Sequence, residues 1–169
     1  MQIPTVLGSY LQDRFQELTD TVNAILDGQP TPTPTPTPSG DETIRGIQEW
    51  LNNEYGASLV VDGIYGAKTH KALVKALQHE FNVQFNAGLV EDGIFGAKTK
   101  AACRNIRKGM SGNITKLIQC ILYCRGYNPG AIDGMFGNKT QDAVMDFQCD
   151  YELYIDGIVG KDTFEKLFK

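Results

Sequence analysis

The residues of this chain that could carry chemistry include two histidines and four cysteines. His70 and His79 lie nine residues apart on one expected helix, so they face different directions and have no third metal ligand beside them. Cys120 and Cys124 lie four apart on one helical face, but the short-spaced pairs typical of zinc sites are absent. We therefore expect no metal, no cofactor and solvated histidines. The cysteines are expected to pack as small apolar residues in a reducing setting, and a disulfide from Cys149 to Cys120 or Cys124 stays open.

Carboxylates recur in a turn that occurs four times. Its glycines permit backbone angles that a side chain disfavours, its Asp can bond nearby amides, and its Thr is expected to satisfy amides of the following helix. Each carboxylate is thus committed to one turn, and no pair is placed for acid and base catalysis or for a calcium loop. We expect no catalytic residue. The copies are Asp62-Gly-Ile-Tyr-Gly-Ala-Lys-Thr69, Asp92-Gly-Ile-Phe-Gly-Ala-Lys-Thr99, Asp133-Gly-Met-Phe-Gly-Asn-Lys-Thr140 and Asp156-Gly-Ile-Val-Gly-Lys-Asp-Thr163.

A glutamine that follows an apolar residue precedes every turn. The distance from this Gln to the Asp is 14 residues in the first three copies and 8 in the last. Such constancy predicts a repeated unit of helix, loop and turn, with a shorter loop in the last copy. The glutamines are Gln48, Gln78, Gln119 and Gln148.

Helical spacing of apolar residues surrounds these turns. It predicts an all-α fold of two tandem three-helix units, at residues 42–108 and 109–169, each small but able to fold alone. The first expected helix ends near Tyr55. The other expected helices cover about 67–83, 97–106, 113–125, 138–150 and 161–168.

The first 41 residues have a different character. Within residues 1–28, Leu11, Phe15, Leu18, Val22 and Ile25 form the seam of an amphipathic helix. Two interpretations stay open: self-association into a homo-oligomer through residues 9–27, or a remnant of an upstream domain. Residues 29–41 alternate Pro and Thr and predict an extended linker.

Composition excludes several classes of partner. The net charge is −4, and residues 41–113 carry nine basic against eight acidic side chains, so no segment is strongly basic. We expect no nucleic-acid or membrane partner held by charge. No apolar run could cross a bilayer, and the first residues lack the pattern of a secretory signal, so we expect synthesis in the cytoplasm.

The ordered motifs of residues 114–169 resemble the three-helix peptidoglycan-binding domain of cell-wall hydrolases and phage endolysins. Residues 43–106 resemble a second, more divergent member. Val159, where the other turns have an aromatic residue, and Lys166, where they have Ala, depart from the repeat. The motifs are Ile118-Gln119-x-x-Leu122, Gly126-Tyr127, Ile132-Asp133-Gly134-x-Phe136-Gly137-x-x-Thr140-x-x-Ala143-Val144-x-x-Phe147-Gln148 and Ile155-Asp156-Gly157-Ile158-Val159-Gly160-x-x-Thr163.

This resemblance implies a non-catalytic module that binds bacterial peptidoglycan, as the targeting part of an endolysin or autolysin. The alternative is a wall hydrolase whose catalytic residues the motifs do not reveal. A hydrolase domain in a longer parent is an implied partner, and the wall after release or lysis is the implied location. For Phe95 and Phe136, a role as core residues that lock turn to helix is the favoured alternative to ligand binding. The candidate ligand-binding residues are Asp62, Tyr65, Asp92, Phe95, Gln119, Arg125, Tyr127, Asp133 and Phe136.

Overall fold

The computed structural model describes residues 40–169. The predicted helix within residues 1–28 and nearly all of the predicted linker at residues 29–41 lie outside this part. Only helices appear as regular elements in the described part, as predicted. They are α2 (Glu42–Tyr55), α3 (Ala67–Phe85), α4 (Ala97–Ala102), α5 (Asn113–Cys124), α6 (Asn138–Asp150) and α7 (Lys161–Phe168).

The N-terminal end of α2 is set by Asp41, the last residue assigned to the linker. Its carboxylate accepts hydrogen bonds from the backbone N–H groups of Thr43 at 2.7 Å and Ile44 at 3.0 Å. These bonds satisfy donors that have no partner within the helix. Asp41 therefore belongs structurally to α2.

The helix α4 is shorter than predicted. It ends at Ala102, and the chain extends from Cys103 onward. Ile106 and Val159 exchange two backbone hydrogen bonds, of 3.2 and 2.8 Å, in an isolated antiparallel bridge. A pairing partner from the far end of the chain thus takes the backbone groups that a longer helix would have used.

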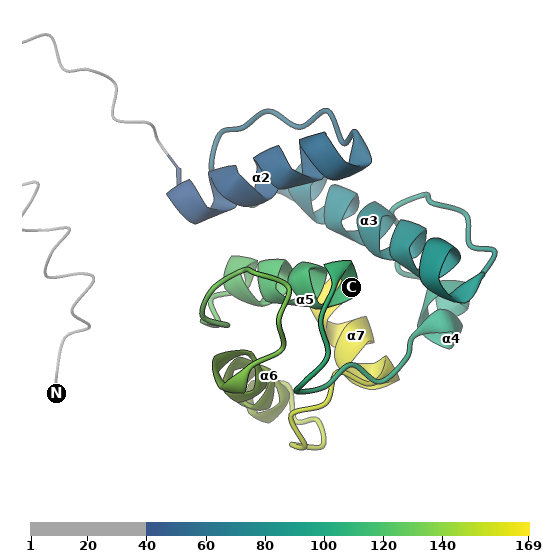
Figure 1. Cartoon of the computed structure of the whole chain (residues 1–169), viewed down its shortest axis with the longest axis vertical. Coiled ribbons are helices and arrows are strands. Elements are labelled where there is room, and N and C mark those ends of the chain that lie inside the picture. Colours follow the sequence, from purple (N-terminus) through teal and green to yellow (C-terminus); the bar gives the residue numbers. More distant parts are fainter. Residues whose placement is uncertain (1–39) are drawn as a thin grey trace, which may run out of the picture. The chain divides into compact units, whose positions relative to one another are not determined.

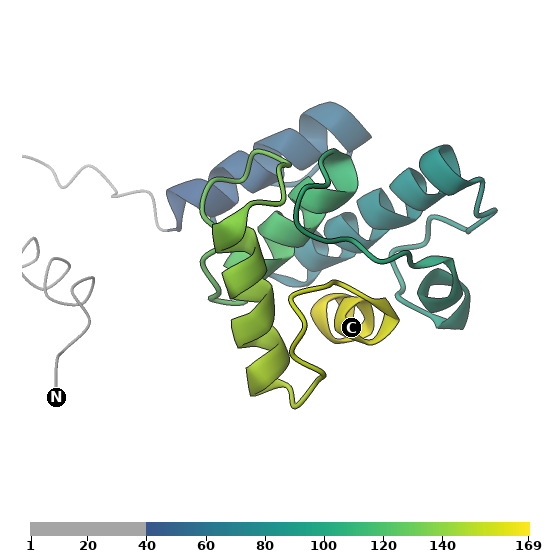
Figure 2. The same ribbon diagram turned by 60° about the horizontal axis from the view of Figure 1, so that its bottom comes forward.

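The helix α5 lies at the centre of the fold. It packs against α3, α6 and α7, and both views show it among these elements (Figures 1 and 2). Its sequence explains the position, because residues on every side of it are buried, including Leu117, Ile118, Cys120 and Ile121. A short helix that is apolar all round requires cover on all faces.

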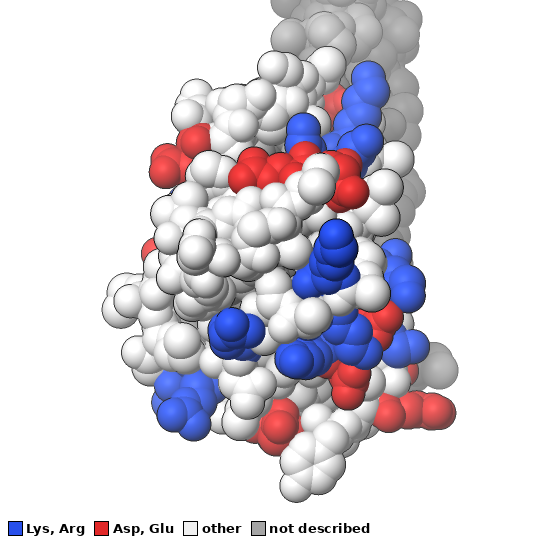
Figure 3. Space-filling model, turned by 90° about the vertical axis from the view of Figure 1, so that its right-hand side faces the viewer, with Lys and Arg blue, Asp and Glu red and all other residues white. Residues whose placement is uncertain are grey.

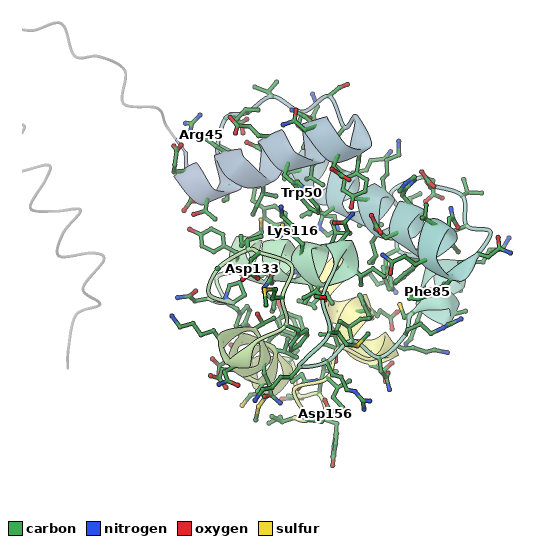
Figure 4. The ribbon with its side chains drawn as sticks, viewed as in Figure 1. Arg45, Trp50, Phe85, Lys116, Asp133 and Asp156 are labelled. Carbon is green, nitrogen blue, oxygen red and sulfur yellow. The ribbon has the colours of Figure 1, made fainter. Side chains whose placement is uncertain are left out.

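The two halves share one hydrophobic core. Phe81 of α3 meets Phe164 of α7 with ring centroids 5.8 Å apart, and Phe95 stacks on Phe168 at 6.3 Å. Figure 4 shows Lys116 of α5 beside Trp50 of α2, with its ammonium 4.4 Å from the ring centroid. The described residues, 40–169, accordingly belong to one compact unit. The division at residues 108 and 109, and independent folding of each half, stay predictions.

Candidate ligand-binding surface

One hydrogen-bond network occurs in all four copies of the turn. The Gln side chain of the preceding helix donates from Nε2 to the Asp Oδ1, to a carbonyl of the turn and to the Thr hydroxyl. Its Oε1 accepts from the N–H of the turn glycine, at 2.8 to 2.9 Å. The Nε2–Oδ1 distances are 2.8 Å for Gln48–Asp62, 2.9 Å for Gln78–Asp92, 3.2 Å for Gln119–Asp133 and 2.9 Å for Gln148–Asp156.

The glycine of each turn lies close to the helix before it. Gly134 has a φ of 78°, the positive angle that the Asp-Gly pattern predicted. A Cβ atom at this position would lie 3.2 Å from the carbonyl oxygen of Gly112, next to the start of α5. The turn therefore needs glycine both for its backbone angle and for its close approach.

The threonines have a different role from the one predicted. The helices that follow the turns have a glycine at the N-cap position and receive no side-chain cap, so the prediction that Thr satisfies their first amides is wrong. The N-cap residues are Gly66, Gly96, Gly137 and Gly160. Thr140, which is 1% exposed, accepts from Gln119 and donates to the carbonyl of Pro129 at 3.1 Å. The hydroxyl belongs to the buried network because it points inward.

This network accounts for four of the candidate ligand-binding residues. Gln119 is 1% exposed, and its amide is fully engaged by the turn. In the turns of Asp62, Asp92 and Asp133, the Oδ1 atom accepts from the amide two residues on, at 2.8 to 2.9 Å. These bonds are structural, and a ligand-binding role of the four residues stays a prediction.

Three of the four residues that follow Asp-Gly-x are core residues. Phe95 is 7% exposed, Phe136 is 2% exposed and Val159 is fully buried. The interpretation of Phe95 and Phe136 as core residues is therefore the one that matches the structure. Tyr65 at the equivalent position is half-buried, and its hydroxyl lies 2.6 Å from Nδ1 of His70.

The remaining candidates, Tyr65, Arg125 and Tyr127, come together with two further side chains. Arg125 donates to the hydroxyl of Tyr151 at 3.4 Å, and its charge acts on Tyr65, His70 and Tyr127. The Nε atom of Arg125 is buried and has no hydrogen-bond partner among the described residues. Buried donors are normally paired, so this atom indicates a place for a ligand or water oxygen. We name Tyr65, His70, Arg125, Tyr127 and Tyr151 the Arg125 cluster.

Burial is the largest cause of the pKa shifts of Tyr65, His70 and Tyr127 in the Arg125 cluster. It raises the pKa of Tyr65 to about 12, against the opposing effect of the Arg125 charge. Burial, followed by the Arg125 charge, lowers the pKa of His70, so this ring is neutral at pH 7. Burial and the hydrogen bond to Asp150, of 2.8 Å, raise the pKa of Tyr127 to about 12. Tyr65, His70 and Tyr127 are therefore neutral at pH 7 and lie within the electrostatic influence of the Arg125 guanidinium.

A second concave region was not predicted from the sequence. It is a cleft of about 550 Å³ between the C-terminal end of α2, the loop at residues 56–59 and one face of α3. Lys68, Lys71 and Lys75 line it from α3. Their spacing of three and four residues was a signal for a shared helical face, but it resembled an ordinary solvated surface.

No group of three or more potential metal-binding side chains occurs in the described part of the chain. His79 is exposed and lies 3.2 Å from Glu91, whereas His70 is half-buried against Tyr65, so the prediction of a solvated histidine is wrong for His70. All four cysteines are free, and burial raises the pKa of the Cys103 thiol to about 12. The disulfide from Cys149 is not formed in this structure.

Charge is mixed on the surface. Figure 3 shows Lys and Arg side chains interspersed with Asp and Glu on the face that it presents. Among the described helices, none combines the length and the apolar character needed to cross a membrane. The absence of a nucleic-acid or membrane partner held by charge stays a prediction.

Residues 111–167 match the sequence profile of the family described as "Putative peptidoglycan binding domain". Residues 111–167 are thus similar to this family. The match contains the third and fourth turns with Gln119 and Gln148, so two of the four copies of the buried network lie within the matched region.

Relatives of known sequence align over more of the chain than this domain. An uncharacterized protein of Bacillus subtilis, FadG, is 33% identical over 133 residues, which cover 75% of this chain and 23% of FadG. The N-acetylmuramoyl-L-alanine amidase CwlM of Mycobacterium tuberculosis is 29% identical over 128 residues, or 76% of this chain and 26% of CwlM. The solved N-terminal domain of SleB is 34% identical over 38% of this chain and 88% of that domain, with a TM-score of 0.37. The chain spans about a quarter of the length of FadG and CwlM.

Proposed function

We propose that residues 42–169 are a tandem pair of peptidoglycan-binding domains that attach a larger cell-wall hydrolase, an endolysin or autolysin, to the wall without cleaving it. The observation that carries this proposal is the buried Gln network. It is present twice in the half that matches the family and twice, with the same donors and acceptors, in the half before it.

Two observations support the assignment of the first half. The Nε2 atoms of Gln48 and Gln119 each donate to an Asp 14 residues on and a Thr 21 residues on. The alignments to FadG and CwlM also cover about three quarters of the chain, which is more than residues 111–167 can supply. A divergent copy that conserves the internal bonds but changes its surface explains both observations.

The Arg125 cluster is the proposed contact surface for the wall. Its tyrosine rings offer faces on which sugar rings can pack, and its guanidinium offers donors to carboxylate or carbonyl oxygens. Because Tyr65 comes from the first half and Arg125 and Tyr127 from the second, this surface needs both domains in place. The exposed turns around Asp62, Asp92 and Asp133 are secondary candidates.

Support for a targeting role comes from the relatives. CwlM is an N-acetylmuramoyl-L-alanine amidase, and this chain matches about a quarter of it. We infer that the hydrolytic activity of such proteins resides outside the matched region, and that a hydrolase domain is part of the parent of this chain or a partner of it. The location that follows is the bacterial cell wall.

The test is sedimentation of the full chain with purified peptidoglycan, with turbidity recorded in the same samples. We expect the protein in the pellet and constant turbidity. Arg125→Gln combined with Tyr127→Ala should reduce the bound fraction while the circular dichroism spectrum is unchanged. Protein that stays in the supernatant would refute wall binding, and clearing of the suspension by the pure chain would refute the non-catalytic role.

A homo-oligomer through residues 9–27 is proposed on sequence grounds alone. The apolar seam from Leu11 to Ile25 would join several pairs of domains and raise their avidity for the wall. Light scattering on the full chain and on a version that begins at Asp41 tests it. We expect a mass above that of a monomer only for the full chain, and equal monomeric masses would refute the oligomer.

A further inference from the structure

The cleft in the first half has the dimensions and shape of a ligand site. Its volume of about 550 Å³ falls within the range of about 300–1,000 Å³ that is usual for small-molecule pockets. Its lining includes Ala72 and Ala76 of α3, Tyr55 of α2 and residues 56–59 of the loop. The small alanine side chains leave room for an extended chain of a few residues.

Some of the charged side chains that line the cleft have partners in the described part of the chain, and others form no salt bridge there. Lys68, Lys71 and Lys75 are exposed and form no salt bridge with the described part of the chain. The Glu91 carboxylate, by contrast, lies 3.2 Å from His79 and accepts a hydrogen bond from Asn82 at 3.1 Å. Glu91 is therefore engaged, whereas Glu54, the other carboxylate of the lining, forms no salt bridge with the described part of the chain. Three ammonium groups against one unpaired carboxylate leave an excess of positive charge for an anion.

In the second half, the residues equivalent to two small residues of the cleft are large. Counted from the network Gln, Tyr127 takes the place of Gly56, and counted from the network Thr, Phe147 takes the place of Ala76. The rings of Tyr127 and Phe147 pack edge to face at 5.3 Å, and Tyr151 stacks on Phe147 at 4.3 Å. These rings occupy the space that stays open in the first half.

The charges of the two faces also differ, although Lys68 has a basic counterpart in Lys139. Counted from Thr69 and Thr140, Lys71 corresponds to Asp142 and Lys75 to Asp146, and both aspartates are exposed. Across the cleft, Glu54 corresponds to Arg125. The two halves thus offer contrasting surfaces, a basic open cleft and an aromatic face with acidic neighbours.

We propose that the cleft between α2 and α3 binds the stem peptide of peptidoglycan through its free carboxylates, whereas the glycan is left to the Arg125 cluster. This proposal rests on the proposed wall-binding function. The N-acetylated glycan is uncharged, while the stem peptide carries carboxylates on its γ-linked glutamate and its terminal alanine. The lysine ammonium groups favour the stem peptide because it carries carboxylates. The small side chains of Ala72 and Ala76 favour a peptide backbone over a sugar ring.

The experiment is a titration of the full chain, labelled with ¹⁵N, with two soluble probes. One is the synthetic stem pentapeptide L-Ala-γ-D-Glu-L-Lys-D-Ala-D-Ala, and the other is the glycan probe chitotetraose. We expect the peptide to shift the amide resonances of residues 56–59 and of the exposed face of α3. The triple variant Lys68→Gln, Lys71→Gln and Lys75→Gln should weaken peptide binding by about tenfold, as expected for loss of the exposed ion pairs to the two carboxylates of this peptide.

A matched variant controls for net charge. Lys98, Lys108 and Lys166 are exposed and lie outside the cleft, so replacing these three with Gln changes the charge equally and should leave the peptide affinity unchanged. Equal losses in both variants, or peptide shifts confined to the Arg125 cluster, would overturn the proposal. Sedimentation with whole peptidoglycan is measured in parallel. Retained sedimentation without peptide binding at the cleft refutes this inference alone, whereas loss of sedimentation by the unchanged chain refutes the proposed function.

Discussion

The first and second halves of the described chain share the same buried hydrogen-bond network but differ in the side chains on their surfaces. In each half, two glutamines hold two Asp-Gly turns against the preceding helices with the same set of bonds. Outside this network, Gly56 and Ala76 leave a cleft in the first half, and Tyr127 and Phe147 fill the equivalent space in the second. The buried network fixes the backbone of the turns, and surface side chains do not determine where the turns lie. The surface residues of the two halves can therefore differ without changing the fold.

The largest expected effect comes from separating the halves. Phe81, Phe164 and Phe168 are at most 1% exposed and lie where the halves meet. Burial of each is worth roughly 1.5–3 kcal/mol, so residues 42–108 and 109–169 expressed separately should each be several kcal/mol less stable than the joined chain. Urea unfolding followed by circular dichroism measures this. Two separate halves that are each as stable as the intact chain would show that the shared core is energetically unimportant.

Replacement of a turn glycine should have the next largest effect. Gly134→Val forces a β-branched residue into a positive φ and towards the Gly112 carbonyl, which should cost about 1–3 kcal/mol. Gly63→Val should cost at least as much, because its Cβ would lie 2.7 Å from backbone atoms of Asp41. Gly137→Ala is the matched control, since its φ is −92° and no atom lies within 4 Å of the added Cβ. Unchanged melting temperatures for both valine variants would contradict the turn geometry.

Truncation of the network glutamines tests whether the buried network stabilises the two halves to the same extent. Gln78→Ala and Gln119→Ala each remove the acceptor of a turn-glycine N–H and the amide donor to a buried threonine hydroxyl, at a cost of about 2–3 kcal/mol. We expect similar losses of unfolding free energy in the two variants, measured in urea. A loss confined to Gln119→Ala would mean that the first half does not depend on the network, and would weaken its assignment to the same family.

Acid sensitivity should be the smallest effect. Hydrogen bonds from Gln48 and Ile64 lower the pKa of Asp62, those from Gln78 and Ile94 lower that of Asp92, and those from Met135 and Gln119 lower that of Asp133. A folded pKa below the unfolded value of about 3.9 gives stability that is present above that pH and is lost as pH falls through the folded pKa.

Asn in place of these aspartates keeps the acceptor and removes the titration. The triple variant Asp62→Asn, Asp92→Asn and Asp133→Asn should therefore show a smaller fall in melting temperature between pH 5 and pH 2 than the unchanged chain, as measured by circular dichroism. Identical pH profiles would show that the three carboxylates contribute nothing through their charge.

The sequence alone determined the repeat and most of the helices. Glycine at a positive φ, an Asp that bonds its own turn, and Gln at a constant distance are local or periodic requirements, so they are visible without coordinates. The helices α6 and α7 begin and end at the predicted residues for the same reason. The end of α4 was missed because a partner more than fifty residues away, Val159, takes the backbone of Ile106.

Exposure was decided only by the tertiary structure. Phe95, Phe136 and Tyr65 occupy the same position of the repeat, yet the first two are buried and Tyr65 is half-buried beside His70. Whether a side chain faces core or solvent depends on what the other half places against it. Likewise, the charge of Arg125 acts on Tyr65 of the other half because α5 packs against the first half. The cleft lies between elements that are separate in sequence, and small residues of the loop and of α3 line it. The volume of a cleft depends on how several elements pack together, so the residue spacing within one element does not predict it.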